Sequence, residues 1–239
     1  RLLLGGDLDG IADMAREQVA AGAHVLDVFV AMPEQPDEAA LMGAVVQRLS
    51  TAVDVPLMID STQPAVFARA LEYVPRGTIL NSVSLQQGRD AIDTVLPMAL
   101  AHDAAVVALT IDEAGMATTA ARKLAIARRI HDIVVGEYGL TADTLLIDPL
   151  TFTVGAGKAE WIDTAHETIE AIRAIKRELP RVMTIVGVSD VSFGLPPPAR
   201  IVLNSVFLHL CADAGLDVAI VDPSRLRAVA DLDRDGRRL

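Results

Sequence analysis

The chain alternates without interruption between short apolar runs and longer segments whose apolar residues recur with a helical period. Strictly alternating strands and helices form right-handed βαβ units, so the pattern predicts parallel strands covered by helices. The runs expected as strands lie at 24–31, 56–60, 78–82, 104–110, 144–148, 182–188 and 217–221. The segments expected as helices lie at 8–22, 37–52, 64–73, 88–102, 117–137, 159–178 and 198–214.

This order predicts an α/β fold, a (β/α)8 TIM barrel, and a chain of 239 residues can form such a barrel as one domain. Apolar residues make up 51% and aromatic residues 3%, which matches the Ala, Val, Leu and Ile mixture of buried parallel strands. The missing eighth strand could precede Arg1, come from elsewhere or be absent, and we expect it before Arg1. We expect the barrel to occupy 1–230 and the polar stretch 231–239 to be a tail or linker.

Charge and cysteine content limit the classes of partner and the location. The formal net charge of −11 disfavours nucleic acid and anionic membranes as partners, because both attract a basic protein face. No apolar stretch approaches the about 20 residues that span a bilayer. Cys211 is the only cysteine and no signal segment opens the chain, so we expect a cytoplasmic protein without an internal disulfide. A homodimer is left open as the assembly.

Three polar side chains stand at the ends of apolar runs: Asp60 in PLMID, Asn81 in TILN and Asp148 in TLLID. Parallel barrel strands bring their carboxyl ends to one face, so we predict that the three converge on a single site. Carboxylates suit the adjacent N–H donors of an amino-pyrimidinone edge, and an amide supplies both a donor and an acceptor. The same residues could also serve only locally, as a backbone acceptor, a turn residue and a helix N-cap.

Four further residues are candidates for the same mouth of the barrel. Ser189 and Asp190 lie in the loop GVSDVSFG at 187–194, although a lone loop aspartate often satisfies only a local turn. Asp27 interrupts the apolar run HVLDVFVA, where a charge costs stability unless it is paired or faces a polar cavity. Asp112 follows the run at 104–110 and could reach the mouth or cap helix 117–137.

Motifs for metals and nucleotides are not found. The five histidines are scattered without the spacing of a zinc site, so no metal is predicted. Cys211 lies in LHLCADAGL and is expected as a core thiol. The phosphate loops GxGxxG and GxxxxGK[ST] are absent, although GAGK at 155–158 superficially suggests one.

In their order, these segments resemble the pterin-binding barrel of cobalamin-dependent methionine synthase and related corrinoid methyltransferases. The likeness covers nearly the whole chain, through AREQVAAGAHVLDV, PLMIDST, ILNSVS, VVALTIDEAGMATTAARK, LLIDPLTF, IKRELP, GVSDVSFG and VFLHLCADAGLDVAIVDP. The resemblance implies a folate pterin in the barrel mouth, held at its pyrimidine edge by Asp60, Asn81 and Asp148. It also places Ser189 and Asp190 in the loop that approaches the N5 side of the ring.

The reaction that the resemblance implies is transfer of the N5 methyl group of 5-methyltetrahydrofolate to a cob(I)alamin carried by a partner protein or domain. A tertiary amine leaves poorly unless N5 is protonated, so Asp190 is expected as the catalytic residue that stabilises the cation or donates a proton. The family usually has Asn at this position, and an ionised carboxylate can only accept, so the change could weaken catalysis. No cobalamin-binding motif such as DxHxxG is present, so the corrinoid must come from elsewhere.

Other functions are kept as alternatives. The barrel also resembles dihydropteroate synthase, but the lysine and SRK-like motif of that family are missing from GVSDVSFG and IVDPSR. A folate-binding module that has lost catalysis is the non-enzymatic alternative, and binding without turnover would identify it. A Schiff-base aldolase is disfavoured because Lys123, Lys158 and Lys176 fall on predicted helices or loops.

Overall fold

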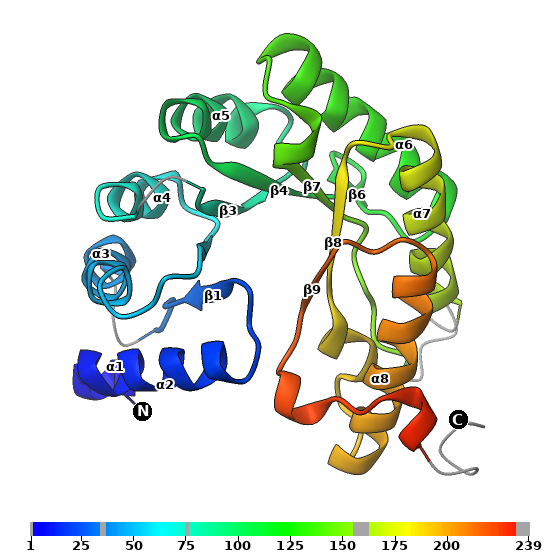
Figure 1. The fold of residues 1–239 in the computed structure, drawn as a ribbon. Coiled ribbons are helices and arrows are strands. Elements are labelled where there is room, and N and C mark those ends of the chain that lie inside the picture. Colours follow the sequence, from blue (N-terminus) through cyan, green and yellow to red (C-terminus); the bar gives the residue numbers. More distant parts are fainter. Residues whose placement is uncertain (1, 34–36, 75–76, 155–162, 233–239) are drawn as a thin grey trace. The chain divides into compact units, whose positions relative to one another are not determined.

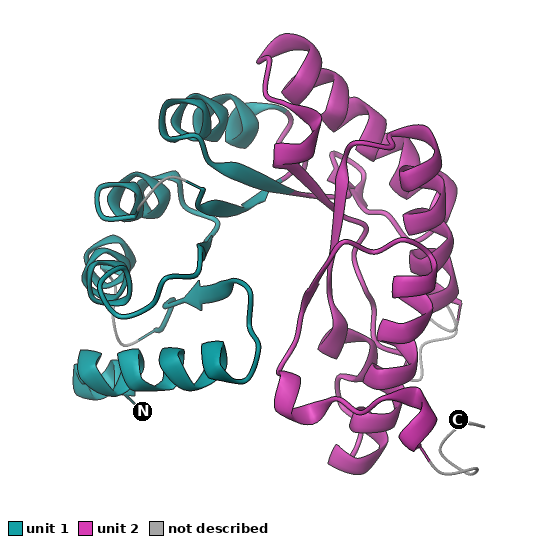
Figure 2. Ribbon diagram, in the orientation of Figure 1, with its two compact units in different colours: residues 1–83, 89–107 teal, residues 84–88, 108–239 magenta. Residues whose placement is uncertain are grey.

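The structure, a computed structural model, describes residues 2–33, 37–74, 77–154 and 163–232. The chain divides into two compact units, which Figure 2 colours separately. Unit 1 is residues 1–83 and 89–107, and unit 2 is residues 84–88 and 108–239. The GAGK sequence and the start of the helix expected at 159–178 lie outside the described residues, as does most of the expected tail.

All the predicted strands are present, and each observed end lies within two residues of the predicted one. They are β1 (Leu26–Phe29), β2 (Leu57–Asp60), β3 (Ile79–Val83), β4 (Ala105–Leu109), β7 (Leu145–Asp148), β8 (Met183–Gly187) and β9 (Val218–Ile220). The pairs β1–β2, β2–β3, β7–β8 and β8–β9 are parallel, as the alternating pattern predicts.

The predicted helices are confirmed as well. They are α2 (Leu8–Ala20), α3 (Glu38–Leu49), α4 (Pro64–Leu71), α5 (Asp90–His102), α6 (Ala120–His131), α7 (Thr164–Glu178) and α8 (Pro197–Asp213). Several begin where a short polar side chain accepts a hydrogen bond from the first turn: Asp37 accepts from the Ala40 amide at 2.9 Å, and Thr119 caps α6. Local capping chemistry therefore fixes these helix starts.

Unit 1 holds the strand order β1-β2-β3-β4, with α2 to α5 packed along it (Figure 1). Buried residues on both faces of β2, namely Leu57, Met58 and Ile59, explain why that strand reads as a continuous apolar run. Only its last residue, Asp60, is partly open to solvent. The strand is thus buried up to its polar last residue.

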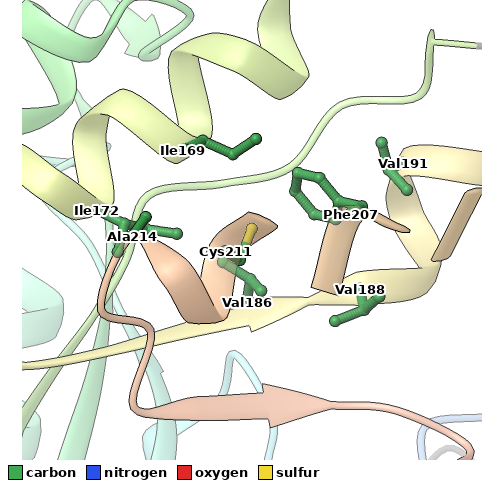
Figure 3. Close-up of a cluster of buried hydrophobic side chains, with 8 residues drawn as sticks. All are labelled: Ile169, Ile172, Val186, Val188, Val191, Phe207, Cys211 and Ala214. Carbon is green, nitrogen blue, oxygen red and sulfur yellow. The ribbon is translucent and has the colours of Figure 1, made fainter. Parts of the chain in front are cut away.

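Unit 2 contains the end of β4 and the strand order β4-β7-β8-β9. Its core lies between α7, β8 and α8, and Figure 3 shows the side chains that fill it. Val188 and Val191 belong to this core and lie within the short 3₁₀ helix η5 (Val188–Ser192). The segment after β8 is therefore anchored by two buried valines.

Three local features were not predicted. A short helix, α1 (Leu2–Gly5), precedes α2. An antiparallel hairpin of β5 (Ile111–Asp112) and β6 (Gly115–Met116) follows β4, and Gly115 adopts φ +97° beside its turn. The predicted helix 117–137 is divided into α6 and a π-helical stretch, η1 (Asp132–Glu137). Among the described residues, no helix is long and apolar enough to cross a membrane.

Candidate functional site

Three polar side chains of unit 1 lie on one face of neighbouring strands. Phe29 on β1 is in register with Asp60 on β2, and Asp60 is in register with Asn81 on β3. Asp27 stands two residues before Phe29, so it projects to the same face. The structure therefore brings together three of the predicted site residues: Asp27, Asp60 and Asn81.

The two carboxyl groups of this cluster, Asp27 and Asp60, both have raised pKa values. Although Asp27 is exposed as a residue, loss of water around its carboxyl group and the nearby Asp60 charge raise its pKa to about 7. A hydrogen bond with the Asn81 side chain works in the opposite direction. Burial and the Glu38 charge raise the pKa of Asp60 above its ordinary value. The cluster can thus hold a proton near neutral pH.

Glu38, at the start of α3, ties down the loop that follows Asp60. Its carboxylate accepts a hydrogen bond from Ser61 Oγ at 2.6 Å and another from Gln63 Nε2 at 2.7 Å. The Ser61 amide in turn donates to the Asn81 carbonyl at 2.8 Å. Glu38 is thus a supporting residue that sequence reasoning missed, because an acid in the first turn of a helix is ordinary on its own.

In unit 2, Asp148 ends β7 and shapes the turn that follows. Its Oδ1 accepts from the Leu150 amide at 2.7 Å, and its carbonyl accepts from the Thr110 amide at 3.0 Å. Burial and the Asp190 charge raise the pKa of Asp148 to about 7, against the Leu150 hydrogen bond and the Lys123 charge, which lower it. One oxygen thus serves the local turn, whereas no helix begins at Asp148 for it to cap, and hydrogen-bonding capacity remains on the carboxyl group.

Lys123, near this turn, is the second supporting residue that sequence reasoning missed. It lies on α6, as predicted, but its side chain is fully buried and its Nζ donates to Leu150 O at 3.0 Å and Thr168 Oγ1 at 2.7 Å. Burial lowers the pKa of Lys123 to about 8, against the nearby charges of Asp148 and Glu167. A helical lysine is usually exposed, so only its place in an apolar stripe could have marked it.

Ser189 and Asp190 are exposed on η5, between the buried Val188 and Val191. Although Asp190 is exposed as a residue, partial loss of water around its carboxyl group raises its pKa, while the Arg200 charge lowers it. A Cβ atom added at Gly187 would lie 2.6 Å from Asp190 Oδ2, so the glycine leaves room for this carboxylate. The Asp190 charge is near enough to raise the pKa of Asp148, which makes the two residues one cluster within unit 2.

Arg200 on α8 holds the same loop in place. Its Nε donates to Ser192 Oγ at 3.1 Å, and its guanidinium also reaches Ser189 O at 3.4 Å. A cavity of about 520 Å³ borders this loop and is lined in part by Ser189, Arg200 and Asn204. The loop with Asp190 is therefore braced by an arginine and open on one side to a space of ligand size.

Asp112 makes its contacts within the β5–β6 hairpin and with α6. Its carboxylate pairs with Arg122 at 2.6 Å and accepts from the Ala114 amide at 3.0 Å within the β5–β6 hairpin. The helix-capping role considered for it is taken by Thr119 instead. Its assignment to substrate binding stays a prediction, and its observed contacts are those of a hairpin brace.

Comparisons with known proteins fit this geometry. The family model described as "Pterin binding enzyme" matches residues 2–222. Methionine synthase of Mycobacterium tuberculosis is 43% identical over 94% of this chain, and that of Mycobacterium leprae is 38% identical over 99%. The chain spans about one fifth of the length of these relatives, 19% and 20%. The resemblance predicted from the strand-end segments is confirmed.

Solved structures with a similar fold include dihydropteroate synthases. A Yersinia pestis structure matches with a TM-score of 0.68 at 19% identity, covering 91% of this chain and 84% of that one. A Xanthomonas albilineans structure matches with a TM-score of 0.66 at 20% identity, covering 94% and 82%. At this level of identity the likeness concerns the fold, and it confirms the predicted α/β barrel class of the pterin-binding type.

Proposed function

This chain belongs to the pterin binding enzyme family, and from that premise we propose that it binds 5-methyltetrahydrofolate and prepares its N5 methyl group for transfer. The identity to methionine synthases favours methyl transfer over the synthase reaction, because the structural likeness to dihydropteroate synthases concerns the fold. The chain spans about one fifth of the length of those relatives, so only this step of their activity is proposed for it.

The single observation that carries the proposal is the strand-end cluster of unit 1. Asp60 and Asn81 are in register on adjacent parallel strands, and Asp27 hydrogen-bonds with the Asn81 side chain. A pterin presents adjacent N–H donors and ring acceptors along its pyrimidine edge, and a carboxylate beside an amide complements such an edge. We assign Asp60 and Asn81 to that edge.

Asp148 in unit 2 is assigned to the same edge by the resemblance. Its Oδ1 already accepts from the Leu150 amide, so further ring N–H groups would bind its second oxygen or share the first. A ring that donates to this carboxyl group favours its ionised form. Folate binding should therefore strengthen as the pH rises through about 7, the pKa of Asp148.

Asp190 is proposed as the residue that acts at N5. When the methyl group leaves, N5 keeps the bonding electron pair, and departure is favourable only if N5 is protonated. Burial raises the pKa of Asp190, which makes a protonated carboxyl group more available than for an ordinary aspartate. Ser189 beside it can supply a hydroxyl that donates or accepts at the ring.

The methyl acceptor that we propose is a reduced corrinoid carried by a partner protein or domain, which supplies a strong nucleophile for methyl groups. Two donor groups among the described residues do not fit that cofactor: His102 Nδ1 lies 3.0 Å from Met98 O in its own helix, and the Cys211 thiol is fully buried. We therefore assign the corrinoid to the partner, and this chain's residues to binding and proton transfer on the folate.

The proposal is tested by titrating the chain with 5-methyltetrahydrofolate and then mixing the complex with free cob(I)alamin. Binding followed by formation of methylcobalamin, seen in its absorbance, supports the enzyme. Binding without transfer identifies a folate-binding module that has lost catalysis. No binding contradicts both.

Asp190 is tested in the same assay under single-turnover conditions. Asp190→Ala should slow methyl transfer by about 10²-fold or more, because general acid–base groups contribute about that much. Asp190→Asn, which restores the residue usual in the family, should retain more activity than the alanine variant. A transfer rate in Asp190→Ala equal to that of the unchanged chain would show that Asp190 has no role at N5.

A further inference from the structure

A buried ammonium group supports the turn that carries Asp148. Lys123 Nζ donates to the Leu150 carbonyl at 3.0 Å and to Thr168 Oγ1 at 2.7 Å, and the side chain is fully buried. Thr168 Oγ1 also lies 2.7 Å from the same carbonyl. Burying a lysine costs free energy unless its charge is compensated, so its presence at this point calls for a role beyond packing.

The Leu150 backbone needs such support. Leu150 adopts φ +63°, a conformation that residues with a side chain seldom occupy, and its amide donates to Asp148 Oδ1 at 2.7 Å. A residue in this region is held there by its surroundings. The Lys123 and Thr168 contacts hold the Leu150 carbonyl, while Asp148 holds its amide.

Several charged or titratable groups lie near Lys123 and Asp148. Asp148 on β7, Glu167 on α7 and the Cys211 thiol on α8 act on Lys123. Asp190 on η5 and Lys123 on α6 act on Asp148. Glu167 Oε2 also accepts a hydrogen bond from the Ala120 amide at 2.5 Å. The positive charge of Lys123 therefore opposes the effect of the Asp190 charge on the pKa of Asp148.

We propose that Lys123 is a positioning residue for Asp148: it fixes the turn at Leu150 and supplies the positive charge that keeps Asp148 ready to accept hydrogen bonds. This inference rests on the proposed function, in which Asp148 reads the pterin edge. Lys123 does not itself touch the ring. Removing the Lys123 charge should raise the pH at which Asp148 ionises. Folate binding at neutral pH should therefore weaken.

The experiment compares Lys123→Met with a matched lysine of the same unit. Lys176 also donates to a backbone carbonyl, Val182 O at 3.0 Å, but pairs with Asp217, so Lys176→Met is the control. The titration of the Asp148 carboxyl carbon is followed by NMR, with Asp148→Asn to assign its signal. Folate affinity is measured from pH 5 to 9 by calorimetry with 5-methyltetrahydrofolate.

Lys123→Met should move the Asp148 midpoint upward by about one pH unit and weaken folate binding at pH 7 by about fivefold. Lys176→Met should change neither quantity, and Lys123→Arg should restore the midpoint toward that of the unchanged chain. If Lys123→Met does not fold, Thr168→Val replaces it; this variant keeps the charge and should move the midpoint in the same direction by less.

An unchanged Asp148 midpoint in a folded Lys123→Met variant overturns the inference, even if folate binding weakens. A shifted midpoint supports it. If the midpoint shifts but the unchanged chain fails to bind 5-methyltetrahydrofolate, the link from Lys123 to Asp148 is upheld and the proposed function is the part that fails.

Discussion

In unit 1 the acids of the strand-end cluster act on one another, whereas in unit 2 each has a cation nearby. Asp60 raises the pKa of Asp27, and Glu38 raises that of Asp60. In unit 2 the Lys123 charge lowers the pKa of Asp148, and the Arg200 charge lowers that of Asp190. Burial is the main cause that raises the pKa of all four acids; the charges around the first cluster mostly add to this effect, whereas basic partners oppose it in the second.

This difference separates two ways of building a polar site on parallel strands. The unit 1 cluster is made by register, since its residues occupy neighbouring positions on β1, β2 and β3. The unit 2 cluster is made by helices and loops that bring Lys123 and Arg200 to Asp148 and Asp190. Variants in each cluster can show whether both serve the folate and whether the pKa values of their acids respond to different neighbours.

The largest effect is expected from removing one carboxylate of either cluster. Asp60→Asn and Asp148→Asn should each weaken 5-methyltetrahydrofolate binding by about 10- to 100-fold, the cost of about 1.5–3 kcal/mol for a charged hydrogen bond. Calorimetric titration at pH 8 measures this loss. Asp217→Asn, which affects a carboxylate paired with Lys176, is the control. A loss confined to one of the two variants would assign the ring to one cluster alone.

The next effect concerns the pH dependence of stability. Asp148 has a native pKa of about 7, above its ordinary value of 3.8, so between these pH values the native state holds a proton that the unfolded state has released. This group therefore lowers the free energy of unfolding as the pH rises from about 4 to 7. Asp148→Asn should remove that loss and be more stable above pH 7 by on the order of 1–3 kcal/mol, with no difference below pH 4.

Asp27→Asn should behave with the same sign, because the pKa of Asp27 is also raised to about 7. Its gain should be smaller, since part of the residue is open to solvent. Urea unfolding at several pH values measures both variants. Equal stability of a variant and the unchanged chain at pH 4 and at pH 8 would show that folding does not raise the pKa of the substituted carboxyl group.

A smaller effect is expected at Glu38, the acid that supports the unit 1 loop. Glu38→Gln removes a negative charge near Asp60 and weakens charged hydrogen bonds to Ser61 and Gln63. The pKa of Asp60 should fall, and stability should decrease by about 1 kcal/mol. NMR titration of the Asp60 carboxyl group and urea unfolding measure the two changes. An Asp60 midpoint that does not move would contradict the repulsion described for this cluster.

The smallest change in stability is expected at Gly187. A methyl group there would meet Asp190 Oδ2 at 2.6 Å, and this flexible carboxylate can move away with little cost to the fold. Gly187→Ala should therefore slow methyl transfer severalfold while stability changes by less than about 1 kcal/mol. Gly136→Ala, at a position where an added Cβ meets nothing within 4 Å, is the control. Unchanged transfer in Gly187→Ala would show that the position of Asp190 is not critical.

The fold was largely predictable because parallel strands buried on both faces and their covering helices leave distinct periods in the sequence. The run PLMID and the stripe that follows it, for example, correspond to β2 and α4. The β5–β6 hairpin was not predictable in this way, since its two strands are only Ile111–Asp112 and Gly115–Met116. Two-residue strands are too short to show a period.

Within the candidate site, residues at strand ends were predictable and their partners were not. Asp60, Asn81 and Asp148 each close an apolar run, so local sequence marks them. Glu38 lies 23 residues from the Ser61 that it contacts, and Lys123 lies 27 residues from Leu150. Neither the spacing nor the residue type signals such a contact, because it depends on how α3 and α6 pack.

The sequence by itself determined the succession of strands and helices and the identity of the polar residues at the strand ends, because both follow from local periodicity and from the transition between apolar and polar residues. Only the tertiary structure decided which charges those residues feel. Asp148 shares its surroundings with Lys123 and Asp190, whereas Asp27 shares its own with Asp60 and Asn81. The physical reason is that a pKa depends on burial and on charges within a few ångströms, and packing alone brings distant residues that close.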